Sequence, residues 1–181
     1  AVVAVGASAG GLEALHDLLR SARRDDRAAY VIIQHLDPTH DSVLAELLDR
    51  RTELSVQQAS DGLEVQPGHV YTIPPGARML IEDGRLKLTQ FDQPRGLRRP
   101  IDDFFESLAH DRGPASVCVI LSGTGADGTL GLRAIKEHGG MCVVQEPSTA
   151  RYDGMPLSAE STGLVDFVLP CERIVPTILQ F

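Results

Sequence analysis

Ser8 lies in the segment VVAVGASAGGLEAL, where a short β-branched run ends at Gly6 and a helical pattern of leucines begins soon afterwards. This strand, tight turn and helix fit the G-x-S-x-G nucleophile elbow, in which small neighbours leave the serine hydroxyl exposed. The segment lacks the second glycine of a dinucleotide fingerprint and the lysine of a P-loop, so it does not indicate a phosphate site. Serine is also a favoured N-cap of helices. This stretch alone leaves a nucleophile and a helix cap about equally open.

A histidine and an aspartate follow two other strand-like runs. His35 ends AAYVIIQH, and Asp127 follows PASVCVILSG within GTGADG. Because the carboxyl ends of parallel strands face one crevice, we expect both side chains to lie near Ser8. A hydroxyl, a general base and an acid that orients the base are what nucleophilic acyl transfer requires. Each has a structural alternative, since His35 could bond backbone at its strand end and Asp127 could cap the helix that it precedes.

The segment SGTGADG also offers backbone donors. Three glycines around Thr124 permit N–H groups to point into the crevice, where they would bind a developing oxyanion. The N-terminus of the helix that begins near Asp127 adds a field that favours negative charge. Asp37 is a weaker candidate for the acid, because it lies only two residues from His35 in the same loop.

Strand-like aliphatic runs alternate with helical patterns along most of the chain. This alternation predicts an α/β fold with a doubly wound, mostly parallel sheet and helices on both faces. Asp83-Gly84, between two alternating runs, predicts an antiparallel hairpin at one edge of the sheet. No repeat or linker interrupts the pattern, so residues 1–181 are expected to form a single domain. The expected strands span residues 2–6, 28–35, 54–59, 114–123, 140–146 and 163–169, and the expected helices include 41–51, 127–138 and 171–180.

The composition argues against several other classes of protein. With 17 lysines and arginines against 25 acidic residues, the net charge of −8 disfavours a nucleic-acid-binding surface. No apolar stretch is long enough to span a bilayer and no signal peptide is visible, so we expect a cytoplasmic domain without membrane insertion. The three cysteines form no C-x-x-C pair and the histidines do not cluster at ligand spacing, so we expect no metal and no organic cofactor.

Four segments, in this order, resemble the catalytic domain of the chemotaxis-receptor methylesterases, the CheB family: VGASAGGLEAL, VIIQHLDPTH, DGLEVQPGHVYTIPPG and VILSGTGADGTLGLRAIKEHGG. The resemblance covers essentially the whole chain. It implies a serine hydrolase that removes methyl esters from receptor glutamates, releases methanol and, in many members, deamidates receptor glutamines. It places the nucleophile at Ser8, the base at His35 and the acid at Asp127. It also assigns an oxyanion-hole amide to Thr124, with the backbone of Ala9 as the other expected donor.

The chain departs from the family pattern in several places. Many members have threonine where this chain has Ala9, and many have methionine where it has Thr124, a change that keeps the backbone amide. The usual regulatory receiver domain is not in this chain. PRGLRRPIDDFFESLA is more similar to versions fused to a receptor methyltransferase and sensor domains. We therefore expect a methylesterase domain cut from a longer multidomain protein, with a methylated chemoreceptor as its substrate and the fused domains as its partners.

Three arginines, Arg95, Arg98 and Arg99, lie in the loop PRGLRRP. They are candidates for docking an acidic receptor helix, and a solvated loop is the alternative. Two other functions stay open from the sequence. One is a small-molecule carboxylesterase that uses the same three site residues, and the other is a non-catalytic regulatory docking domain.

Overall fold

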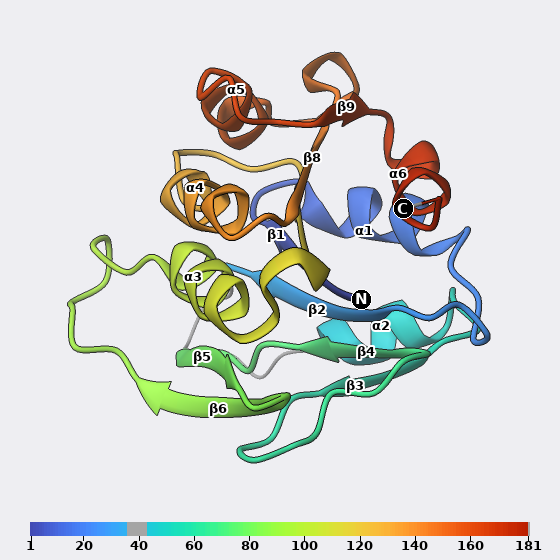
Figure 1. Cartoon of the computed structure of the whole chain (residues 1–181), viewed down its shortest axis with the longest axis vertical. Coiled ribbons are helices and arrows are strands. Elements are labelled where there is room, and N and C mark those ends of the chain that lie inside the picture. Colours follow the sequence, from blue (N-terminus) through green and yellow to red (C-terminus); the bar gives the residue numbers. More distant parts are fainter. Residues whose placement is uncertain (36–42, 181) are drawn as a thin grey trace.

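The computed structural model describes residues 1–35 and 43–180. Within these residues seven parallel strands form the main sheet, in the spatial order β3-β4-β2-β1-β7-β8-β9 (Figure 1). β1 and β7 are buried at every position, because helices cover both faces of the sheet. The strands are β1 (Val2–Ala7), β2 (Ala29–Gln34), β3 (Ser55–Gln58), β4 (His69–Thr72), β7 (Ser116–Ile120), β8 (Met141–Gln145) and β9 (Phe167–Leu169).

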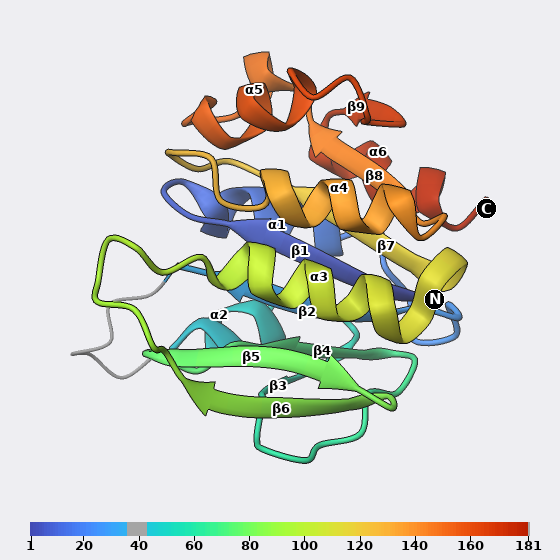
Figure 2. The ribbon, with the colours of Figure 1, turned by 60° about the vertical axis from the view of Figure 1, so that its left-hand side comes forward.

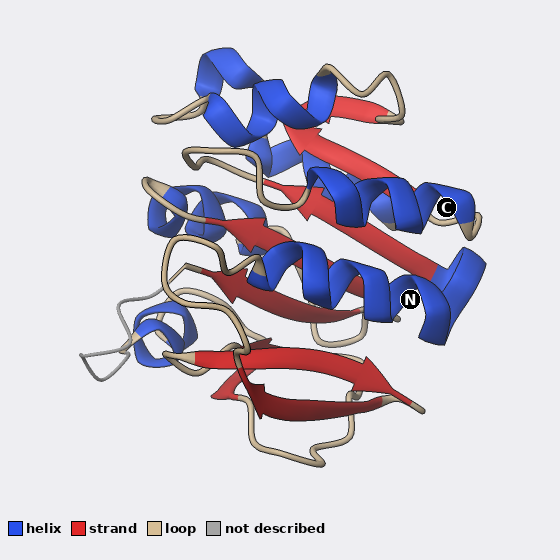
Figure 3. Ribbon diagram, turned by 90° about the vertical axis from the view of Figure 1, so that its left-hand side faces the viewer, coloured by secondary structure: helices blue, strands red, loops and turns tan. Residues whose placement is uncertain are grey.

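Two sets of helices enclose the main sheet, as Figure 3 shows. The set on one face is α1 (Gly11–Leu19), α2 (Leu44–Asp49) and α6 (Cys171–Ile178). The set on the other is α3 (Pro100–Arg112), α4 (Thr129–Glu137) and α5 (Gly154–Glu160). The side chains of β1 alternate between two cores, with Val3 and Val5 on the α1 side and Val2 and Ala4 on the α3 side. The predicted doubly wound α/β fold is confirmed.

Three details differ from the sequence prediction. One is β4, which joins the main sheet although no strand was expected over residues 69–72. The hairpin of β5 (Ala77–Glu82) and β6 (Arg85–Gln90) forms around Asp83-Gly84, but it is a separate antiparallel sheet rather than an extension of the main one. The hairpin lies beside α3 (Figure 2). Its buried apolar side chains belong to the same core as those of α3, on one face of the main sheet. The helix predicted over residues 41–51 is observed as α2, with residues 41 and 42 outside the described part.

The structure also contains short 3-10 helices. They are η1 (Gly113–Ala115) and η2 (Pro147–Thr149). None of the helices found in residues 1–35 and 43–180 is both long enough and apolar enough to cross a membrane.

The strand order places the site. β1 pairs with β2 on one side and with β7 on the other. The strands β2 to β4 lie on one side of β1 and the strands β7 to β9 on the other, so β1 marks the switch point of the sheet. In such sheets the loops at the carboxyl ends diverge around the switch point and leave a crevice. The three loops that follow β1, β2 and β7 begin with or contain Ser8, His35 and Asp127. The sheet therefore brings these residues to one edge.

Candidate active site

The backbone of Ser8 is held in a tight turn directly after β1. The N–H of Ser8 donates to the carbonyl oxygen of Ser122 at 3.0 Å, and the carbonyl oxygen of Ser8 accepts from Gln34 Nε2 at 3.1 Å. Gly10 follows with a left-handed φ of 75°, and a Cβ at this position would lie 2.7 Å from Ser122 Oγ. α1 begins at Gly11 without any side-chain cap. Ser8 therefore does not cap α1, which was the structural alternative for this residue.

The hydroxyl of Ser8 faces the glycine-rich loop after β7. Thr124 N donates to Ser8 Oγ at 3.0 Å, and Oγ lies 3.5 Å from Met155 Sδ. A Cβ at Gly123 would lie 2.4 Å from both Ser8 Oγ and Met155 Sδ, so a side chain there would displace the Ser8 hydroxyl or Met155. The Ala9 amide has no hydrogen-bond partner among the described residues. An amide beside the nucleophile is well placed to bind an oxyanion that forms on the carbon under attack.

His35 and Asp127 are joined directly, although 92 residues separate them in sequence. His35 Nε2 lies 2.7 Å from Asp127 Oδ2. The side chain of His35 is 39% exposed, whereas that of Asp127 is only 8% exposed. Because an ionised carboxylate only accepts hydrogen bonds, we assign the proton of a neutral His35 to Nε2. Nδ1 is then the basic nitrogen of the imidazole.

Ser8 and His35 line the same hollow, which has a volume of about 410 Å³. No hydrogen bond joins Ser8 Oγ to His35 in the part of the chain that the structure describes. The serine hydroxyl instead contacts Thr124 and Met155. The two residues thus lie at one hollow, as expected from the sequence, without a hydrogen bond between them. Catalytic hydrogen bonds of this kind often form fully only when substrate is bound.

Asp127 does cap a helix, but not the one that it precedes in the sequence. α4 begins after Gly128, and the Asp127 carboxylate accepts no hydrogen bond from the first turn of α4 among the described residues. The Asp127 carboxylate instead accepts hydrogen bonds from Ile101 N at 3.1 Å and Asp102 N at 2.9 Å, both in the first turn of α3. Negative charge is favoured at this end of a helix. Asp127 therefore holds His35 and α3 at the same time.

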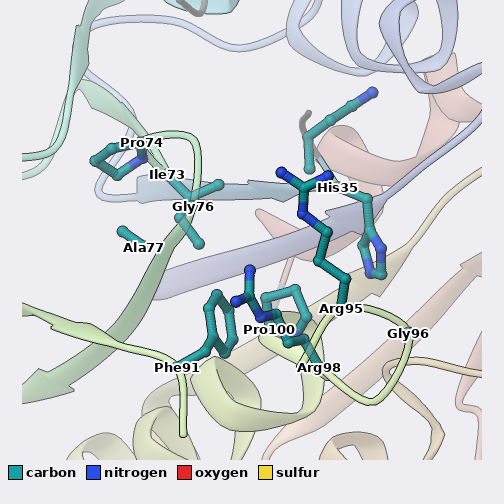
Figure 4. A pocket seen from close by; sticks show the side chains of 11 residues that line it. His35, Ile73, Pro74, Gly76, Ala77, Phe91, Arg95, Gly96, Arg98 and Pro100 are labelled. Atoms are coloured by element: carbon teal, nitrogen blue, oxygen red, sulfur yellow. The ribbon is translucent and has the colours of Figure 1, made fainter. Parts of the chain in front are cut away.

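The three loop arginines do not act as one group. Arg95 and Arg98 line a second hollow of about 390 Å³ beside His35 (Figure 4). Arg99 is directed elsewhere, and its Nε lies 3.5 Å from Oδ2 of the buried Asp102. Arg95 and Arg98 therefore line this hollow next to the site, and Arg99 does not.

The sequence also raised Asp37 as a rival acid and considered metal ligands and cysteines. Asp37, the weaker candidate for the acid, lies outside the described residues. Within residues 1–35 and 43–180 no group of three or more His, Cys, Asp or Glu side chains could hold a metal ion. The free cysteines are all buried and are Cys118, Cys142 and Cys171.

Comparison with known proteins shows the family. The family model for CheB methylesterase matches residues 3–178. The chain belongs to the CheB methylesterase family. The crystal structure of the Thermotoga maritima CheB methylesterase catalytic domain matches it with a TM-score of 0.90 and 31% identity, over 99% of this chain and 97% of that chain.

Relatives of this CheB-family chain are longer proteins. The protein-glutamate methylesterase/protein-glutamine glutaminase of Moorella thermoacetica is 38% identical over 183 residues, which cover 98% of this chain and 43% of the relative. A second such protein, from Pseudomonas aeruginosa, is 38% identical over 99% of this chain and 52% of its own length. An uncharacterized 104.1 kDa protein of Rhodobacter capsulatus is 44% identical over 138 residues, or 76% of this chain and 14% of that protein. The chain thus spans about half or less of these relatives.

Asp102 is a residue of the CheB-family site that sequence reasoning missed. It is buried, and its Oδ1 accepts hydrogen bonds from Gly128 N at 2.9 Å and Gly131 N at 2.8 Å, at the start of α4. Asp102 on α3 therefore binds the start of α4, while Asp127 beside α4 binds the start of α3. Acidic residues after Pro100 indicate a helix start in the sequence, but they do not show that a second helix is bound.

Ser122 is another residue that was missed. It is almost fully buried, and its Oγ donates to the carbonyl oxygen of Ala9 at 2.8 Å and accepts from Tyr152 N at 3.0 Å. Its carbonyl oxygen accepts from Ser8 N. Ser122 thus ties the turn of the candidate nucleophile to the segment before α5. The sequence carried no signal for this role beyond the position of Ser122 at a strand end.

Burial raises the pKa of Asp102 from 3.8 to about 6. The charge of Asp127 acts in the same direction. Hydrogen bonds from Gly131 and Gly128 and the charge of Arg99 oppose the shift without cancelling it. In the folded protein Asp102 therefore binds a proton more readily than it does in the unfolded chain.

We expect Asp102→Asn to change how the free energy of unfolding depends on pH. A raised carboxyl pKa contributes stability that is fully present below about pH 4 and is lost as the pH rises through about 6. The wild type should therefore gain stability from this group between pH 7 and pH 5, and Asp102→Asn should lack this gain. Asparagine keeps an oxygen acceptor for the two glycine amides.

Urea unfolding at pH 5 and pH 7 measures the effect. Glu106→Gln, on the exposed side of α3, serves as a control for the removal of one negative charge. The same pH dependence in the wild type and Asp102→Asn would contradict the prediction.

Proposed function

We propose that this domain is a serine hydrolase that removes methyl esters from glutamate side chains of chemotaxis-type receptors and releases methanol. The observation that carries the proposal is the 2.7 Å hydrogen bond between His35 and Asp127, at the sheet edge where Ser8 follows β1. Two of the matched relatives are named protein-glutamate methylesterase/protein-glutamine glutaminase. Their names support the choice of a protein glutamyl ester as the substrate.

In the proposed reaction Ser8 is the nucleophile. Its Oγ adds to the ester carbonyl carbon, while His35 accepts the hydroxyl proton at Nδ1 and Asp127 stabilises the imidazolium. The amide of Thr124, with that of Ala9, binds the oxyanion. When the intermediate collapses, the bond from the carbonyl carbon to the methoxy oxygen breaks, and His35 transfers its proton to that oxygen so that methanol leaves.

The second half of the reaction frees the enzyme. His35 removes a proton from a water molecule, which adds to the glutamyl–serine ester under the same oxyanion stabilisation. The bond to Ser8 Oγ then breaks, Oγ regains a proton from His35, and the glutamate carboxylate leaves. Hydrolysis of a glutamine amide would follow the same steps with ammonia as the leaving group, so deamidation is included in the proposal.

The setting of the domain is also part of the proposal. Three free, buried cysteines favour a reducing compartment, and we place the domain in the cytoplasm. The match to 14% of a 104.1 kDa relative supports a longer protein. In the proposal the fused parts are sensor and methyltransferase domains, as the resemblance of PRGLRRPIDDFFESLA to fused versions implies.

Receptor membranes that carry labelled methyl esters test the substrate. The wild-type domain should release labelled methanol from them and should turn over p-nitrophenyl acetate only slowly. Fast turnover of soluble esters without release from the receptor would favour a small-molecule carboxylesterase. Failure to release methanol, together with failure to react with a serine-directed phosphonate, would favour a non-catalytic docking domain.

A further inference from the structure

The second hollow lies directly beside the hollow of the candidate nucleophile. Gln34 and His35 line both of them, so they form a shared wall. The rest of the second hollow comes from the turn before β5 and from the loop between β6 and α3 (Figure 4). A molecule that places one group at Ser8 can therefore place a neighbouring group in the second hollow.

Two guanidinium groups give this hollow its charge. Arg98 is held in place, since its Nε donates to the carbonyl oxygen of Gln93 at 3.0 Å and its guanidinium carbon lies 4.9 Å from the centroid of the Phe91 ring. Arg95 extends across the hollow on the side of His35 (Figure 4). Neither arginine forms an ion pair with a carboxylate among residues 1–35 and 43–180, whereas Arg99 is paired with Asp102.

The positive charge of Arg95 and Arg98 stands out because the chain as a whole is negatively charged. The net charge of −8 would repel an acidic partner at long range. A pair of arginines beside the candidate base provides local attraction for an anion. Guanidinium groups suit planar carboxylates, because their donors match the two oxygens.

We propose that the hollow lined by Arg95 and Arg98 is an anion subsite. It binds a carboxylate of the substrate protein that lies close to the esterified glutamate. On a helix, side chains three or four residues apart are neighbours, so an acidic residue at that spacing could enter the subsite while the ester faces Ser8. This inference rests on the proposed function and adds a specificity determinant to it.

Two helical peptides test the subsite. Both carry a single glutamate γ-methyl ester, and they differ only in a glutamate or a glutamine four residues away. The spacing is varied to three residues in a second pair. The enzymes are the wild type, Arg95→Gln/Arg98→Gln, and the control Arg173→Gln, whose exposed arginine lies on α6 at the opposite face of the sheet.

With the glutamate peptide of the preferred spacing, the double variant should show a kcat/KM about tenfold lower than the wild type, mainly through KM. With the glutamine peptide the two enzymes should be alike, and Arg173→Gln should match the wild type throughout. Added salt should reduce the wild-type preference for the glutamate peptide. Turnover of p-nitrophenyl acetate should be the same in all three enzymes.

Two results would overturn the inference while leaving the proposed function intact. One is an equal loss on the glutamate and glutamine peptides, which would indicate a general distortion of the loop. The other is no loss on either peptide. If the wild type hydrolyses neither peptide but cleaves p-nitrophenyl acetate, the proposed function fails and the subsite with it.

Discussion

Ser8→Ala should reduce methanol release from methylated receptor by a factor on the order of 10⁴ to 10⁶, leaving the rate that binding and oxyanion stabilisation alone provide. His35→Ala should be about as damaging, because an unassisted serine hydroxyl is a poor nucleophile at neutral pH. The two residues act in one proton transfer, so the double variant should be hardly slower than either single variant. Timed release of labelled methanol gives the three rates.

The control for this experiment is Ser161→Ala, which removes the hydroxyl of an exposed serine that donates to the carbonyl oxygen of Ser158. It should keep wild-type activity. Losses that multiply in the double variant would mean that Ser8 and His35 act independently. In that case the nucleophile and base assignments would be wrong.

Asp127→Ala should differ from the Ser8 variant in both activity and stability. Its activity loss should be smaller by about two orders of magnitude, because the acid only orients and stabilises the imidazole. Its free energy of unfolding should fall by about 2 kcal/mol or more, because the amides of Ile101 and Asp102 lose their buried acceptor. Relief of the repulsion between Asp127 and Asp102 offsets part of this loss.

Denaturant unfolding and methanol release on the same samples separate the two effects. Asp127→Asn is the matched variant, since it removes the charge but keeps one oxygen that can accept from α3. It should lie between the wild type and Asp127→Ala in stability. If Asp127→Ala were as stable as Ser8→Ala, the role of Asp127 at the start of α3 would be contradicted.

The regular part of the fold could be predicted from local pattern. The run VVAVG is aliphatic apart from its final glycine, and PASVCVILSG is mostly apolar, as expected of strands buried on both faces. The first run lies in β1, and β7 lies inside the second. β4 was not predicted, although it lies inside the main sheet between β3 and β2. The hairpin itself was found from Asp83-Gly84, but its packing beside α3 was not.

For the site, the sequence supplied the residue types and one geometric rule. Ser8, His35 and Asp127 each follow a strand, and parallel strands bring such residues to one edge. The structure joins His35 to Asp127, but it pairs the Ser8 hydroxyl with Thr124 rather than with His35. A hydroxyl can rotate among several partners, so its choice depends on the local packing and not on the sequence pattern.

The sequence by itself therefore determined the α/β order of elements and the strand ends that carry polar side chains. Both follow from the periodicity of neighbouring residues, which a backbone segment expresses locally. Only the tertiary structure decided that Asp127 binds the start of α3, that Asp102 binds the start of α4, and that Arg99 turns away from Arg95 and Arg98. The two aspartates lie 25 residues apart in sequence. Their hydrogen bonds exist only after α3 and α4 pack together, because the free N–H groups at a helix N-terminus donate to any suitable carboxylate that packing brings to them.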